Sequence, residues 1–171
     1  MKSLFILQLV CCVITAMLAL QLAMASLQVR WKVWRYEISR WILVASMLFF
    51  SVHYLLQMIH GLRAQGADVG AAFNILFYTP VAFAITLSII NIESTGNKVR
   101  RYCLRGMMAY ILIAIVFVIG MFKSQSLHIG NMLYVMLGLF VASMAYFILI
   151  IRKETKARKQ KRSEERRVGK E

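Results

Sequence analysis

Two long apolar runs separated by only six residues constrain this sequence most. The runs cover residues 41–62 and 69–92, and the connector between them, residues 63–68, is polar. At ~1.5 Å per residue, a helix of this length covers the roughly 30 Å hydrocarbon core of a bilayer. Because so short a connector returns the second helix antiparallel to the first, the sequence predicts a transmembrane helical hairpin.

Three further apolar runs extend this pattern. Residues 4–27 precede the hairpin, and residues 106–122 and 132–151 follow it. The chain is 60% hydrophobic with a mean hydropathy of +0.67, and a soluble domain of 171 residues cannot bury that much apolar surface. We predict an all-α integral membrane bundle of five transmembrane helices, with residues 93–105 as a polar loop and residues 152–162 as a basic stalk.

The positive side chains predict the orientation of this bundle. With the N-terminus outside, the cytoplasmic segments hold 4, 4 and 10 Lys and Arg residues, 18 in all. The outer segments then hold Lys2, Arg63 and Lys123. Cytoplasmic loops of membrane proteins are enriched in Lys and Arg, so we predict an outer N-terminus and a cytoplasmic C-terminus. The net charge of +14 is confined to these short segments, which is typical of membrane topology rather than of nucleic-acid binding.

A cleaved signal peptide is the alternative interpretation of the first run. Lys2 precedes its apolar core, and Ala23-Met24-Ala25 resembles a cleavage site. Cleavage would leave the four positive residues between 30 and 40 on the outside. We therefore predict that the first span is retained.

Aromatic and basic residues mark the expected membrane surface. Trp31, Trp34 and Trp41 lie among arginines, a composition typical of the headgroup region, and the spacing predicts an interfacial helix that leads into the second span. A cation–π ligand cage is the functional alternative. In the stalk, seven of eleven residues are positive, which predicts attraction to anionic lipid headgroups, with a simple topology anchor as the open alternative.

The hairpin also carries most of the polar residues of the spans. His53, Gln57 and His60 are spaced i, i+4 and i+7, which places them on one helix face. Polar groups inside a membrane generally point toward protein, so this face is expected to meet Asn74 and Tyr78 of the next span. These five residues form the predicted polar pocket.

Three chemical roles are open for this pocket. Its histidines could form structural hydrogen bonds between helices, sense protons or a small ligand, or ligate haem or a metal through His60 and His128. The sequence holds no glycine-rich phosphate loop, paired carboxylates, catalytic triad or cysteine metal cluster. We therefore predict no catalytic, cofactor-binding or metal-ligating residue and no cofactor.

Small residues recur at helical spacing in two spans and predict close helix packing there. The first set lies in the first span and the second set in the fifth: Ala16, Ala19 and Ala23, and Gly138, Ala142 and Ala145.

The hairpin sequence has a resemblance of its own. Residues 51–70, SVHYLLQMIHGLRAQGADVG, followed by NILFYTP at 74–80, resemble the multi-span N-terminal region of bacterial membrane-bound signalling regulators. In that family the spans precede a cytoplasmic histidine kinase or a DNA-binding effector. The resemblance implies a sensor or anchor module in the bacterial inner membrane, dimeric through its stalk and responsive to a small-molecule or envelope signal. The kinase and DNA-binding parts have no counterpart here, so none of their functional residues is carried over.

The last nine residues, SEERRVGKE at 163–171, resemble a translated sequencing-adapter tail. We expect them to be non-native and the natural chain to continue past about residue 162 into an effector. A small haem-binding redox protein, a transporter subunit and a structural membrane protein are the alternative functions.

Overall fold

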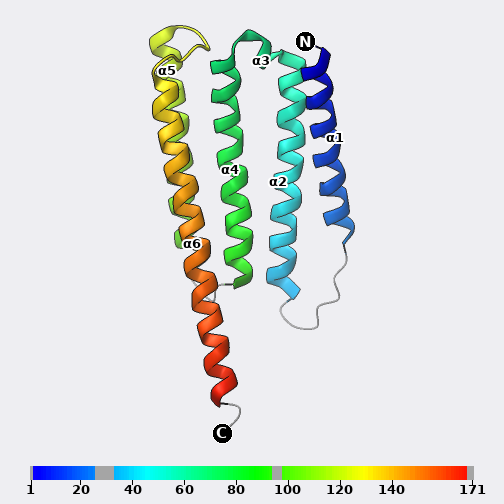
Figure 1. Cartoon of the computed structure of the whole chain (residues 1–171), viewed down its shortest axis with the longest axis vertical. Coiled ribbons are helices and arrows are strands. Elements are labelled where there is room, and N and C mark those ends of the chain that lie inside the picture. Colours follow the sequence, from blue (N-terminus) through cyan, green and yellow to red (C-terminus); the bar gives the residue numbers. More distant parts are fainter. Residues whose placement is uncertain (1, 26–32, 94–97, 169–171) are drawn as a thin grey trace.

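The computed structural model describes residues 2–25, 33–93 and 98–168, and all the regular elements in these ranges are helices (Figure 1). Five of these helices are long and apolar enough to cross a membrane, which confirms the predicted fold class at that level and supports a multi-pass membrane protein. The elements are α1 (Lys2–Met24), α2 (Val33–His60), α3 (Leu62–Gln65), α4 (Ala67–Glu93), α5 (Lys98–Ser124) and α6 (Met132–Val168).

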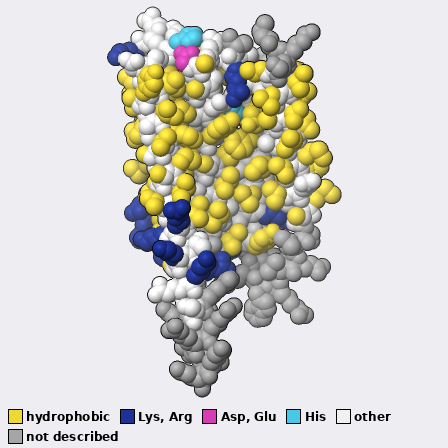
Figure 2. All heavy atoms as spheres, viewed as in Figure 1, with side chains coloured by type: hydrophobic (Ala, Val, Ile, Leu, Met, Phe, Trp, Pro, Cys, Tyr) yellow, Lys and Arg dark blue, Asp and Glu magenta, His cyan; other side chains and the backbone are white. Residues whose placement is uncertain are grey.

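The five long helices form a bundle in which α4 is central. Helix α2 packs between α1 and α4, and α4 packs in turn against both α5 and α6 (Figure 1). We call the end that holds α3 and the 125–131 loop the top end, and the end where α6 continues beyond the bundle the stalk end. Figure 2 shows a hydrophobic band across the visible face of the bundle, with Lys and Arg side chains gathered toward the stalk end.

Three helices are longer than their apolar runs. Helix α2 begins at Val33, so the described part of the predicted interfacial segment, residues 33–40, and the second span form one continuous helix. Helix α5 begins at Lys98 rather than at residue 106, so most of the expected polar loop is helical. Lys and Arg are good helix formers whose long stems can lie along apolar surface, and charge alone therefore does not end a helix. Helix α6 continues through the stalk to Val168, because residues 152–168 contain neither Pro nor Gly.

The turn after α2 depends on a glycine. Gly61 has φ 57°, in the left-handed region that glycine adopts at little cost, and it directly follows the last residue of α2. The short helix α3 then covers three of the six residues of the predicted connector, and α4 begins inside that connector at Ala67. The connection between α2 and α4 is therefore six residues long, as expected, but it covers residues 61–66 rather than 63–68.

The apolar core lies between α4, α5 and α6. Close helix approach is visible at Gly106, where an added Cβ atom would lie 1.9 Å from the ring of Phe83. Phe83 packs on Phe147 of α6 with 5.7 Å between ring centroids. The core cluster consists of the buried residues Ala72, Ile75, Ile113, Phe117, Ile129 and Met136.

The two sets of small residues have different environments. Ala19 of α1 is buried, and α1 packs against α2. Gly138, Ala142 and Ala145 of α6 are exposed, and a Cβ atom at Gly138 would meet no atom within 4 Å. The predicted seam on α6 therefore makes no close helix contact within the described part of this chain.

Candidate functional site

A chain of hydrogen bonds crosses from α1 through α2 to α4. Gln8 Nε2 donates to Gln57 Oε1 at 3.1 Å, and Gln57 Nε2 donates to Asn74 Oδ1 at 2.7 Å. His53 Nε2 lies 3.1 Å from the same Asn74 oxygen. Gln8, His53 and Gln57 are buried, and Asn74 is partly buried. We call these four residues the amide–imidazole cluster.

Helix geometry explains why these side chains meet. His53 and Gln57 are one turn apart and therefore lie on one face of α2. The antiparallel hairpin brings Asn74 of α4 to that face, and Gln8 approaches from α1. An unpaired amide in hydrocarbon costs several kcal/mol, so these contacts favour an arrangement in which the polar face of α2 points into the bundle.

The cluster has a defined pattern of donors and acceptors. His53 Nε2 and Gln57 Nε2 both approach the Asn74 carbonyl oxygen, so the neutral imidazole carries its proton on Nε2 when the amides lie as observed. The two nitrogens are themselves 3.1 Å apart, and they cannot bond to each other while both donate to that oxygen. If the side-chain amides of Gln8, Gln57 and Asn74 are all rotated so that their oxygen and nitrogen atoms exchange places, every donor becomes an acceptor and every acceptor a donor. His53 then accepts a hydrogen bond through Nε2. The cluster therefore has two complementary hydrogen-bond patterns, which differ in the tautomer of His53.

Aromatic rings surround the imidazole. The His53 ring packs against Phe77 with 4.5 Å between centroids and meets Tyr78 edge-on at 5.6 Å. The Tyr78 hydroxyl lies 3.4 Å from the Tyr54 hydroxyl. His53 is only 1% exposed, so its ring is enclosed by these neighbours and held in place by them.

Four of the five predicted pocket residues come together, and one does not. His53, Gln57 and Asn74 share hydrogen bonds, and Tyr78 contacts the imidazole through its ring. His60 is exposed at the end of α2, where its backbone carbonyl accepts a hydrogen bond from Gln65 at 3.3 Å. Among the described residues, no hydrogen bond joins the His60 ring to the cluster.

Sequence reasoning missed two members of this region, Gln8 and Tyr54. Gln8 is one of two amides in a long uncharged run, which is itself a signal because amides inside a membrane generally find a protein partner. The same run contains Gln21, which is exposed near the other end of α1. Residue type therefore does not separate the two glutamines.

A second polar contact joins α2 and α4 near the stalk end. The Ser39 hydroxyl donates to the Ser88 carbonyl at 3.1 Å. Asn91 Nδ2 donates to the Arg35 carbonyl at 2.9 Å and to Ser39 Oγ at 3.0 Å. Helices α2 and α4 are therefore hydrogen-bonded to each other toward both ends.

A largely apolar surface cavity of about 290 Å³, widely open to the outside of the bundle, lies between these two polar contacts. It borders Pro80, which has no backbone N–H and so removes one hydrogen bond from α4. Neighbouring Thr79 directs its hydroxyl to the Ile75 carbonyl at 2.7 Å. The cavity lining is Ile42, Ala45, Ser46, Phe49, Pro80, Val81 and Ala84.

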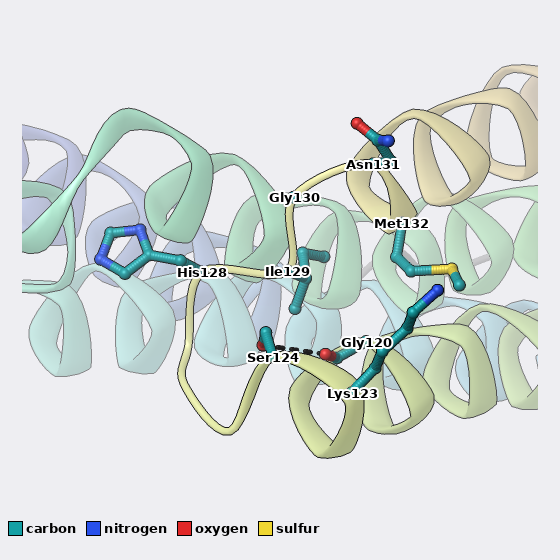
Figure 3. A pocket seen from close by; sticks show the side chains of 8 residues that line it. All are labelled: Gly120, Lys123, Ser124, His128, Ile129, Gly130, Asn131 and Met132. Carbon is teal, nitrogen blue, oxygen red and sulfur yellow. Dashed lines mark hydrogen bonds between the residues drawn. The ribbon is translucent and has the colours of Figure 1, made fainter.

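Another cavity, of about 240 Å³, lies at the top end beside the 125–131 loop (Figure 3). Figure 3 shows the His128 ring pointing away from the other labelled side chains, and its Nδ1 lies 2.8 Å from Asp68 Oδ2. The Ser124 hydroxyl donates to the Gly120 carbonyl at 2.9 Å. His128 and Ser124 are therefore already engaged with protein partners.

The aromatic residues near the stalk end face outward. Trp34 is 76% exposed and Trp41 is 54% exposed. The Arg40 guanidinium lies 5.5 Å from the Trp41 ring centroid and pairs with Glu37 at 2.6 Å. Arg40 therefore lies over the ring that a cation–π ligand cage would use, and Trp31 is outside the described residues.

Metal ligands do not gather in the described part of the chain. There, no group of three or more His, Cys, Asp or Glu side chains lies close enough to hold an ion. The described cysteines, Cys11, Cys12 and Cys103, are free thiols.

No protein-family model, curated protein or solved structure matches this chain.

Proposed function

We propose that this chain is a membrane-embedded sensor or anchor module of a signal-transduction protein in the bacterial inner membrane. The observation that carries the proposal is the double contact made by α4. Asn74 on this helix belongs to the amide–imidazole cluster, whereas Ala72 and Ile75 pack in the core cluster with Met136 of α6. One helix therefore joins the polar cluster to the helix that leaves the bundle as the stalk.

This connection supports a route for a signal. A change between the two hydrogen-bond patterns alters the partners of Asn74, which lies between Ala72 and Ile75 in sequence. A packed interface responds to such a change by moving between discrete arrangements rather than by deforming continuously. Because α6 continues without a break from Met136 to Val168, a displacement of its upper half reaches the stalk.

We place the N-terminus outside and the C-terminus in the cytoplasm. The supporting observation is the concentration of 18 positive residues in the three segments that the sequence predicts to be cytoplasmic, against 3 in the predicted outer segments. The exposed Trp34 and Trp41 lie toward the same end, where aromatic residues suit the headgroup region.

Cysteine labelling tests this orientation. In a background without Cys11, Cys12 and Cys103, an impermeant thiol reagent should modify Gly66→Cys and Ser126→Cys in intact cells. Arg100→Cys should react only after the cytoplasmic side is opened. The reverse pattern would overturn the orientation, and intact-mass measurement of the protein should find residues 1–29 retained.

A chimeric kinase tests the sensor function. Residues 1–162 would be fused to the dimerisation and catalytic domains of a histidine kinase, and autophosphorylation would be measured in membrane vesicles. His53→Leu and Asn74→Leu should change the rate at least about fivefold, as expected for a coupling free energy of 1 kcal/mol or more. Gln21→Leu, which removes an exposed amide from α1, is the matched control and should leave the rate unchanged.

The same chimera separates a sensor from an anchor. Inserting one to four residues after Arg162 rotates the kinase relative to α6, so a transmitting helix should give an output that varies with helical period. Equal activity in every variant, with all proteins present in the membrane, would remove the sensor function and leave an anchor.

A further inference from the structure

We propose that the stalk ends of α5 and α6 together form a binding surface for anionic phospholipid headgroups. We call this surface the cationic collar. All of its side chains are exposed, and they come from two helices far apart in sequence: Lys98, Arg100, Arg101 and Arg105 of α5, and Arg152, Lys153, Lys156 and Lys159 of α6. This inference concerns the lipid partner of the bundle and does not depend on signalling.

A buried carboxylate holds the two helices together at this level. Glu154 of α6 is 6% exposed, although its neighbours Lys153 and Lys156 are exposed. It accepts a hydrogen bond from the Tyr102 hydroxyl of α5 at 2.9 Å, and Lys98 Nζ lies 3.6 Å from its other oxygen. Glu154 therefore faces α5, and the positive residues beside it on α6 are directed away from that contact.

The collar has a large excess of positive charge. Glu154 is the only acidic residue between positions 98 and 160, and Lys98 already lies next to it. No carboxylate of these two segments is left for the other seven members of the collar. Arg105 donates to the Tyr146 hydroxyl at 3.3 Å, which occupies only one of its five N–H groups. Figure 2 shows a dense group of Lys and Arg side chains at the stalk end of the hydrophobic band.

The position of the collar identifies the partner. On α6 the exposed apolar surface includes Leu149, and the positive residues begin three positions later at Arg152. At ~1.5 Å per residue, Lys159 lies about 10 Å farther along the helix, close to the Debye length at physiological salt. The collar therefore borders the surface that faces lipid, at the level where headgroup phosphates lie.

The chemistry of the side chains fits a phosphate diester. A guanidinium can give two parallel hydrogen bonds to phosphate oxygens, and the lysine ammonium groups add point charges around it. A zwitterionic headgroup presents a compensating cation that this surface repels. We therefore expect the protein to select phosphatidylglycerol over phosphatidylcholine.

Native mass spectrometry of the full chain tests this selection. The protein would be ejected from nanodiscs that contain equal amounts of phosphatidylglycerol and phosphatidylcholine, and the bound lipids would be counted. Each cation near an anionic surface strengthens binding about fivefold, so Lys153→Gln combined with Lys156→Gln should lower the preference at least about fivefold. Lys2→Gln combined with Lys123→Gln removes two lysines from the top end and should leave it unchanged.

Further variants exclude a loss caused by misfolding. The double variant with arginine at positions 153 and 156 should keep the preference, and helix content by circular dichroism should be equal in all proteins. An unchanged preference in the glutamine double variant, or an equal loss in the top-end control, would overturn the proposal. Displacement of bound phosphatidylglycerol by a soluble oligonucleotide at matched charge concentration would also overturn it, because the collar would then prefer a soluble polyanion.

Discussion

The two sides of α4 are held by different interactions. Toward α1 and α2, the contacts include hydrogen bonds between side chains, centred on His53, Gln57 and Asn74. Toward α5 and α6, buried apolar residues such as Ile113 and Met136 fill the interface. Hydrogen bonds between amides can reverse direction with little movement of the helices, whereas an apolar interface depends on shape. The first side is therefore suited to alternative states and the second to a single one.

Five helices are long and apolar enough to cross a membrane, and in a bilayer lipid replaces water around such a bundle. Lipid tails are as apolar as the core side chains, so close packing and interhelical hydrogen bonds stabilise helix association in place of the hydrophobic effect. The two sides of α4 rely on these two contributions to different extents. Variants on each side should separate them.

The largest effect is expected on the apolar side. Ile113→Ala should lower the free energy of unfolding by about 3 kcal/mol, because Ile113 is fully buried and its loss leaves a cavity in the core cluster. The free energy of unfolding would be measured in bicelles by steric trapping, under conditions in which unfolding is reversible. Ile115→Ala on the exposed face of α5 is the matched control and should cost much less. Equal costs at the two positions would show that shape does not govern this side.

A somewhat smaller effect is expected on the polar side. Asn74→Leu removes the oxygen that His53 and Gln57 share, and it should cost about 2 kcal/mol in the same assay because two donors lose their partner. Combining it with Gln57→Leu should cost less than the sum of the single changes, since the two residues share one bond. Additive costs would argue against a coupled cluster.

The sequence predicted the number of long helices and the inward face of α2 from apolar runs and helical spacing. It could not predict which neighbour each face would meet. The small residues of α1 and α6 illustrate this, because Ala19 is buried while Gly138 and Ala142 are exposed. Small-residue spacing indicates that a helix can approach closely, but contact also requires a partner at that angle.

Helix ends were also difficult to predict from the sequence. The charges of residues 98–105 resembled a loop, yet this segment is the first part of α5. His60 has the same periodicity as His53 and Gln57, but α2 ends there and its side chain is exposed. Periodicity therefore predicted the face of the helix correctly, whereas the extent of each helix and its contacts depended on the rest of the bundle.

A smaller change in the free energy of unfolding should show whether the hydrogen bonds on the polar side form one connected chain. Gln8→Leu removes only the hydrogen bond from Gln8 to Gln57 Oε1, and it should lower the free energy of unfolding by about 1 kcal/mol. Gln21→Leu is the control on the same helix and should have little effect, since Gln21 is exposed. A cost at Gln8 as large as that at Asn74 would mean that the bond to α1, rather than the shared oxygen of Asn74, governs the cluster.

The smallest effect is expected at the top end, where Asp68 and His128 pair on the surface. Exposed ion pairs contribute little and are screened by salt, so Asp68→Asn should change stability less than any variant above. A double-mutant cycle with His128→Gln should give a coupling that disappears at 0.5 M salt. A coupling that persists at high salt would indicate a shielded contact and would extend the hydrogen-bonded region to the loop.

Pro80 gives the arrangement of α4 a mechanical consequence. This residue divides α4 into an upper arm that carries Asn74 and a lower arm that carries Ser88 and Asn91, and each arm is hydrogen-bonded to α2. The missing backbone hydrogen bond makes this the point where the helix bends most easily. Flexing there would change the angle between the arms while both attachments to α2 hold, and the open apolar cavity beside Pro80 provides space for that movement. Helix α4 is therefore attached to α2 on both sides of Pro80 and is most flexible at Pro80 itself.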